Sequence, residues 1–241
     1  MLAVSLLAAA ALAAHSPAPP STGEELVRLM HDRYAGQWYH TATFVQTTIM
    51  EDGSEETWYE AMMVPGRLRI DIAPLDSAHA IIFANDTMTE MRGGQVTRAV
   101  PLVHPLMVLG FDVYADAPEA TLAKLRGLGF DLSTLHEDTW QGRPVYVVGA
   151  NAGDARTNQF WIDKERLVFV RMIRSRGNVV QETQFNAYEP LGKGWMSAEV
   201  VFMTNGKVVT TEKYADIRGD VPLPDSLFNT STYARPEWVS P

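Results

Sequence analysis

Residues 43–71 carry the feature that most constrains what this chain can fold into, which is a series of β-rich runs separated by tight turns. Asp52-Gly53 separates the first two runs, and Pro65-Gly66 separates the second run from the third. An Asp-Gly pair between apolar runs is the strongest short-range signal for a hairpin, because a type I′ turn needs a positive φ at both central positions. The stretch therefore predicts the start of a large antiparallel meander.

Side chains in the second and third runs alternate between two faces, as expected for strands. The residues expected together on one face are Trp58, Glu60, Met62, Val64, Leu68, Ile70 and Ile72. Arg67, Arg69 and Asp71 fall on the opposite face, and an antiparallel sheet can leave one of its faces polar. Strand patterns return after residue 130, so we expect about ten to eleven strands in all.

Two segments are expected to be helical and to cover the sheet. Hydroxyl side chains at Ser21 and Thr22 precede Glu24 and Glu25 and a set of spaced apolar residues, which is typical of a capped amphipathic helix. The second segment, residues 101–128, is an apolar insertion broken by Pro and Gly. The pattern predicts an α+β fold in which one antiparallel sheet curls around these covers, as a single domain of residues 22–241.

The apolar part of the insertion has two interpretations. Its apolar residues are Leu102, Val103, Leu106, Met107, Val108, Leu109 and Phe111. They form either part of the core or a Pro-hinged lid over a cleft. Eleven Met residues in the chain leave the same choice open, because flexible thioethers fill irregular cores and also line surfaces that accept variable apolar ligands.

Residues 1–14 have the character of a signal peptide. They contain no charged side chain, and their apolar run is far shorter than the roughly 20 residues that span a bilayer. Ala11-Leu12-Ala13 supplies the small-x-small pattern of a cleavage site. A buried Ala/Leu helix and a short membrane anchor are the alternatives, and the expectation is export to the periplasm.

Charge and cysteine content exclude several classes of protein. The net charge of −9 argues against nucleic-acid binding, which requires Lys and Arg to neutralise phosphates, and against a polybasic membrane-binding surface. The absence of Cys excludes disulfides and thiolate metal sites, so the exported domain depends on its core for stability.

No pattern of catalytic or metal-ligating residues is present. The six His residues are dispersed without an HExxH spacing, and the sequence contains neither a GxSxG elbow nor a GKS/T loop. Glu55 and Glu56 are adjacent in a strand and therefore point to opposite faces of the sheet. We expect a protein that is not an enzyme and that holds no metal or cofactor.

Several short motifs occur in the order in which they occur in one known family. They are Phe44-Val45-Gln46, Trp58, Pro65-Gly66-Arg67-Leu68-Arg69, Trp161-Ile162-Asp163 and Leu223-Pro224-Asp225-Ser226-Leu227-Phe228. With the preceding helix, they make the chain similar to the LolA/LolB-like lipoprotein-carrier superfamily over nearly its whole mature length. The resemblance implies an incomplete β-barrel closed by an N-terminal helix and a helical lid at about residues 101–128.

The resemblance also implies a function. It implies a periplasmic carrier that shelters a lipid or the acyl chains of a lipoprotein and takes part in outer-membrane lipoprotein sorting. Such a carrier is expected to be a monomer and to exchange cargo with partners at the inner and outer membranes. The residues expected to line the cavity are Trp58, Met62, Val64, Leu68, Ile70, Leu106, Met107, Leu109 and Phe111. The alternative is an envelope sensor or protein-interaction module on the same fold.

The chain departs from the family at one position. Carriers of the family place an Arg immediately before the Pro that corresponds to Pro65, where it fastens the lid, and this chain has Val64 there. Arg67 and Arg69 lie on the other side of the turn. The lid latch is therefore absent, replaced or apolar.

Overall fold

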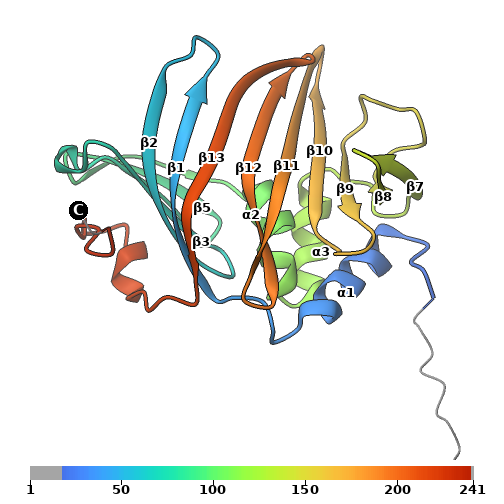
Figure 1. Cartoon of the computed structure of the whole chain (residues 1–241), viewed down its shortest axis with the longest axis horizontal. Helices are drawn as coiled ribbons and strands as arrows, with labels where there is room; N and C mark the ends of the chain where they lie inside the picture. Colours follow the sequence, from blue (N-terminus) through green and yellow to red (C-terminus); the bar gives the residue numbers. More distant parts are fainter. Residues whose placement is uncertain (1–17, 240–241) are drawn as a thin grey trace, which may run out of the picture.

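The computed structural model describes residues 18–239, and its main feature is one thirteen-stranded sheet in which every pair of neighbours is antiparallel (Figure 1). The signal peptide expected at residues 1–14 lies outside the described residues. The strands are β1 (Thr41–Met50), β2 (Glu55–Met63), β3 (Arg67–Ile72), β4 (Ala80–Ala84), β5 (Thr87–Arg92), β6 (Gln95–Pro101), β7 (Leu135–Trp140), β8 (Arg143–Val148), β9 (Gln159–Asp163), β10 (Phe169–Arg176), β11 (Val179–Leu191), β12 (Gly194–Thr204) and β13 (Lys207–Gly219). The helices are α1 (Gly23–Tyr34), α2 (Pro105–Gly110) and α3 (Pro118–Gly127), with short 3-10 helices η1 (Leu75–Ser77), η2 (Asp112–Tyr114) and η3 (Asp225–Phe228).

The order of strands across the sheet is β6-β5-β4-β3-β2-β1-β13-β12-β11-β10-β9-β8-β7. Each half of the sheet is thus a meander of consecutive strands, and the halves meet where β1 pairs with β13. This open α+β sheet confirms the expected fold class. The described residues contain thirteen strands where ten to eleven were expected. The edge strand β6 is mostly exposed and β7 is partly so, and both lack the apolar alternation of the inner strands.

Helix α1 begins as its sequence indicates. The Thr22 hydroxyl accepts a hydrogen bond from the Glu25 backbone N–H (3.2 Å), which satisfies one of the free amides at the helix start. Leu26, Val27 and Met30 are fully buried on one side of the helix, as the amphipathic pattern predicts.

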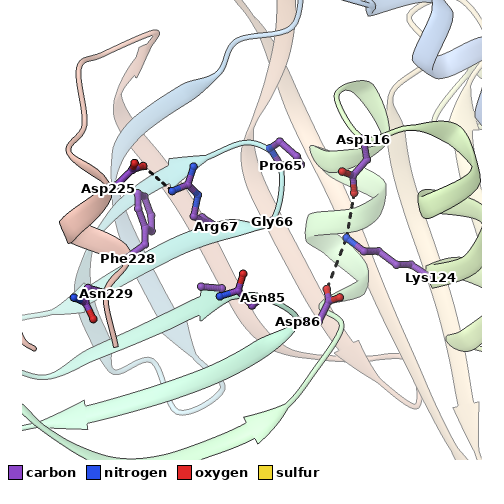
Figure 2. Close-up of a pocket in the computed structure, with 11 residues that line it drawn as sticks. Pro65, Gly66, Arg67, Asn85, Asp86, Asp116, Lys124, Asp225, Phe228 and Asn229 are labelled. Atoms are coloured by element: carbon purple, nitrogen blue, oxygen red, sulfur yellow. Dashed lines mark hydrogen bonds and ion pairs between the residues drawn. The ribbon is translucent and has the colours of Figure 1, made fainter. Parts of the chain in front are cut away.

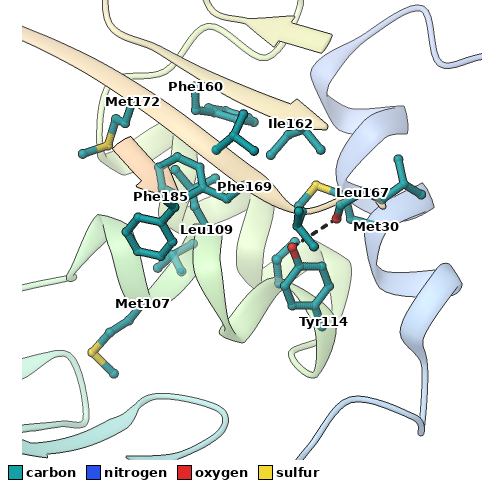
Figure 3. Close-up of a cluster of buried hydrophobic side chains, with 14 of the residues drawn as sticks. Met30, Met107, Leu109, Tyr114, Phe160, Ile162, Leu167, Phe169, Met172 and Phe185 are labelled. Carbon is teal, nitrogen blue, oxygen red and sulfur yellow. Dashed lines mark hydrogen bonds between the residues drawn. The ribbon is translucent and has the colours of Figure 1, made fainter. Parts of the chain in front are cut away.

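The core lies between the sheet and the helices, and we call the sheet face that packs on it the inner face. Figure 1 shows α2 and α3 behind β11 and β12. A cluster that includes Leu109, Phe169 and Phe185 fills the space between α2 and the sheet (Figure 3). Tyr114 of η2 donates a hydrogen bond to the Leu167 carbonyl oxygen (3.1 Å), which ties the helical insertion to the loop before β10.

The C-terminal segment, residues 220–239, covers part of the opposite face. Arg69 is fully buried there, and its guanidinium forms two 2.8 Å contacts with the Asp71 carboxylate. It also donates hydrogen bonds to the backbone carbonyl oxygens of Leu227 (3.0 Å) and Ala234 (2.6 Å), while the Tyr233 ring lies 5.0 Å from the guanidinium carbon. Alternation placed Arg69 and Asp71 on the correct face, but nothing in the pattern indicated that this face is covered.

No helix in the described part of the chain is long and apolar enough to cross a membrane.

Candidate binding cavity

A cavity of about 370 Å³ lies between the start of α2 and the inner face of β10–β13. Its size falls within the roughly 300–1,000 Å³ of typical ligand sites. The lining residues are His104, Pro105, Leu106, Met172, Arg174, Gln181, Glu182, Thr183, Phe202, Met203, Thr204, Val209 and Thr210. Apolar and hydroxyl side chains therefore share this cavity with a few charged groups.

His104, the residue just before α2, lines the cavity and is uncharged. Burial lowers the pKa of its imidazole to about 4. The ring packs edge-on against Phe83, with 4.9 Å between the ring centroids. At neutral pH, His104 thus contributes an aromatic surface and no positive charge.

The structure distributes the nine residues expected to bind ligand over two regions. Leu106 lines the cavity beside α2. Met62, Val64, Leu68 and Ile70 are buried in the core on β2, β3 and the turn between them, and Trp58 is half-buried on β2. Met107 and Leu109 are buried on α2, and Phe111 follows that helix. The expected residues therefore belong to the sheet wall and the lid, but most of them are packed against other side chains.

Sequence reasoning missed the β10–β13 side of the cavity. Met172 and Met203 are two of the eleven Met residues whose role the composition leaves open, and Phe202 and Thr210 carry no signal of a ligand site. These residues line the cavity because the central β1–β13 pairing brings the C-terminal half of the sheet beside the lid. That pairing joins distant parts of the chain and leaves no local pattern.

A hydrogen bond joins the lid to the β2–β3 turn. The buried carboxylate of Asp112 in η2 accepts it from the Gly66 backbone N–H, at 2.8 Å. Val64, where the sequence resemblance led us to look for an Arg, is buried. A carboxylate on the lid and an amide on the turn thus connect the two elements in this chain.

A polar pocket of about 410 Å³ lies beside this connection (Figure 2). Its charged groups are paired with one another. The Lys124 ammonium of α3 lies 3.1 Å from the Asp116 carboxylate and 3.7 Å from that of Asp86, and Arg67 contacts Asp225 at 2.7 Å. These pairs connect the lid and the C-terminal segment to the sheet, so we interpret the charged groups of this pocket as structural.

The Asp112 carboxyl is expected to make stability depend on pH. Burial raises its folded-state pKa to about 6, against an ordinary value of 3.8. The folded protein therefore binds this proton more tightly than the unfolded chain. The resulting stabilisation is complete below pH 3.8 and is lost as the pH rises through 6, up to about 3 kcal/mol in total.

Urea unfolding of the wild type and of Asp112→Asn between pH 4 and 7.5 measures this contribution. The asparagine keeps an oxygen that can accept the Gly66 hydrogen bond but does not titrate. The wild type alone does not isolate this contribution, because the lowered pKa of His104 makes stability rise with pH over part of the same range. The free energy of unfolding of the variant is therefore subtracted from that of the wild type at each pH. A pH-independent difference would contradict the assignment.

No protein-family model matches the sequence, and no curated protein matches it. Solved structures do match. A LolA superfamily protein from Nitrosomonas europaea superposes with a TM-score of 0.54 at 12% identity, covering 87% of this chain and 98% of that one. A putative outer membrane lipoprotein-sorting protein domain from Vibrio parahaemolyticus gives a TM-score of 0.58 at 15% identity, covering 87% and 97%.

A DUF1329 family protein from Desulfovibrio piger gives a TM-score of 0.56 at 14% identity, covering 88% of this chain and 98% of that one. Each match spans most of both chains, so the similarity concerns the whole half-barrel and its covers. At these identities it is a similarity of fold. The chain has the fold of the LolA superfamily, as its sequence motifs led us to expect.

Proposed function

We propose that this protein is a non-enzymatic carrier that shelters a lipid or the acyl chains of a lipoprotein between its lid and its half-barrel. The observation that carries the proposal is the cavity of about 370 Å³ between α2 and β10–β13. Leu106 contributes to it from the lid, and Met172 and Phe202 contribute from the sheet. These side chains offer hydrocarbon and thioether surface to an apolar chain.

Burial of hydrocarbon supplies the driving force. Each CH₂ group transferred from water contributes about 0.8 kcal/mol, so a few methylenes suffice for measurable binding. Unbranched Met side chains adapt to chains of different shape. The cavity therefore favours a flexible aliphatic ligand over a rigid one.

The comparisons support this proposal through one neighbour, which is described as a putative outer membrane lipoprotein-sorting protein domain. By analogy we propose a periplasmic location, a monomeric state, and exchange of cargo with donor and acceptor proteins at the inner and outer membranes. The apolar segment at residues 1–14 supports export as a signal peptide.

A binding experiment with a matched pair of peptides tests the carrier function. Delipidated protein is mixed with a short diacylated peptide or with the same peptide lacking acyl chains, and complexes are detected by native mass spectrometry. We expect a one-to-one complex with the acylated peptide only. Leu106→Glu should weaken this complex at least about tenfold, since it places a charge against the buried chain.

Val208→Glu is the control. Val208 is 45% exposed on β13, whereas its neighbour Val209 lines the cavity. This variant should bind the acylated peptide like the wild type. Equal binding of acylated and unacylated peptides, or equal effects of the two substitutions, would overturn the proposal.

One observation favours the alternative, an envelope sensor or protein-interaction module. The centre of the space between lid and sheet is filled by Leu109, Phe169 and Phe185, and the free volume is displaced toward the start of α2. A module without a transported ligand would show this packing too. Failure of the acylated peptide to bind would leave that alternative as the better account.

A further inference from the structure

A polar cluster lies on the inner face of the sheet, where the β1–β13 pairing joins its two halves. Gln46 and Thr48 of β1 are buried, and the Gln46 amide donates a hydrogen bond to the Thr48 hydroxyl at 2.7 Å. Gln46 lies opposite Tyr214 of β13, and Thr48 lies opposite Glu212. The Tyr214 hydroxyl donates a 2.7 Å hydrogen bond to the Glu212 carboxylate.

Glu60 of β2 belongs to the same face. Its cross-strand neighbours are Phe44 on one side and Ile70 on the other, both core residues. Glu60 is only 4% exposed, and no hydrogen bond or ion pair to its carboxyl is found within residues 18–239, although its oxygens are not among the fully buried polar atoms that lack a partner. A largely buried carboxyl that no protein group pairs is costly, and this one is free to pair with a group that a ligand brings.

No cation of the described part of the chain neutralises these two acids. Neither Glu60 nor Glu212 takes part in any of the ion pairs. The residues paired in turn with Glu60 across β3, β4 and β5 include no Arg or Lys. The first cation in this series is Arg98, which is exposed on the edge strand β6. Burial, reinforced by the charge of Glu212, raises the pKa of Glu60 well above its ordinary value, and burial raises the pKa of Glu212 to about 7.

The cluster lies on the same face of the sheet as the candidate binding cavity and next to it along β13. Thr210, which lines the cavity, is two residues from Glu212 on β13 and therefore points to the same face. Phe202 lies opposite Thr210, and Val200 lies opposite Glu212. An elongated ligand that leaves the cavity along β13 would thus meet apolar side chains first and Glu212 next, with Glu60 farther on, across β1 on β2.

We propose that Glu60 and Glu212 bind the ammonium group of an amphiphilic amine whose hydrocarbon chain occupies the cavity beside α2. This inference rests on the carrier function proposed above and adds a head-group preference to it. An ammonium group can donate three hydrogen bonds and supplies the positive charge that the cluster lacks. The same two carboxyls disfavour a ligand that brings a carboxylate or phosphate to this position.

Three ligands with the same chain and different head groups test the preference. Isothermal titration at pH 7.5, below the micelle concentration, compares n-dodecylamine, n-dodecanol and dodecanoate. We expect the amine to bind at least about tenfold more tightly than the alcohol, and the dodecanoate most weakly. Amine binding should also release protons to the buffer, because the bound ammonium favours the ionised form of both carboxyls.

The variants Glu60→Gln and Glu212→Gln should each reduce amine affinity at least about tenfold, toward that of the alcohol. Glu56→Gln is the control, since Glu56 lies on the same strand and face but is exposed. It corrects for general attraction of the amine to an acidic protein, and it should bind the amine like the wild type.

Folding of the variants is checked by thermal unfolding without ligand. Glu60→Gln is expected to raise the melting temperature, because a neutral amide costs less to bury than an unpartnered carboxyl. Equal affinities for amine and alcohol in the wild type would overturn the inference while leaving the carrier function intact. Absence of binding by all three ligands would instead count against the carrier function on which the inference rests.

Discussion

Replacing Arg69 with alanine is expected to lower the free energy of unfolding by about 3–5 kcal/mol. The substitution leaves the buried Asp71 carboxylate without its guanidinium partner. It also removes the donors to the carbonyl oxygens of Leu227 and Ala234, which hold the C-terminal segment on the sheet. Loss of one member of a buried ion pair is costly because the remaining charge stays out of water.

Urea unfolding followed by tryptophan fluorescence measures this loss. Arg67→Ala is the matched control, because Arg67 lies on the same strand and face and pairs with Asp225 at an exposed position. It should cost no more than about 1 kcal/mol. The double variant Arg69→Met/Asp71→Leu should recover much of the lost stability, since apolar residues can replace a buried pair. Similar losses for Arg69→Ala and Arg67→Ala would contradict this account of the C-terminal segment.

Leu109→Ala is expected to lower the free energy of unfolding by about 2–5 kcal/mol. Leu109 is fully buried in α2, and the adjacent Gly110 faces Phe185 so closely that a Cβ atom there would lie 3.0 Å from its ring. Because the lid and sheet are packed this closely, the space left by the missing side chain cannot readily collapse. A residual cavity therefore adds to the lost burial.

Leu106→Ala, three residues earlier in the same helix, provides the comparison. Leu106 is only partly buried and faces the cavity of about 370 Å³, so its truncation should cost less than about 1 kcal/mol of stability but should weaken binding of an acylated peptide. If Leu109→Ala weakened binding without affecting stability, Leu109 would line a ligand site and the lid would be looser than its packing indicates.

The sequence predicted the elements whose signals are local. The Asp52-Gly53 turn lies between β1 and β2, where Ile49 pairs with Glu55, and the Thr22 cap begins α1. The helical segment expected within residues 101–128 contains α2 and α3. Hairpin turns and helix caps depend on neighbouring residues, which is why they can be read from a single chain.

The remaining features depend on contacts between distant residues. Arg69 looked like one member of a polar face, because its partners at Leu227 and Ala234 are about 160 residues away. The β10–β13 wall of the cavity was missed for the same reason. Glu60 differs from these residues. Strand alternation places its carboxyl on the same face as Trp58, Met62 and Ile70, and an acid on an apolar face is a local signal of the polar cluster.

The pairing of the first strand with the last has a consequence for how a newly made chain folds. Each meander consists of sequence neighbours and can form early, whereas Thr43 and Arg218 are 175 positions apart and must meet to join the halves. Until the two halves join, β1 and β13 have unpaired backbone N–H and C=O groups that can pair with strands of other unfolded chains. The middle of the finished sheet, not its margins, is therefore where this protein is most prone to aggregation during its synthesis.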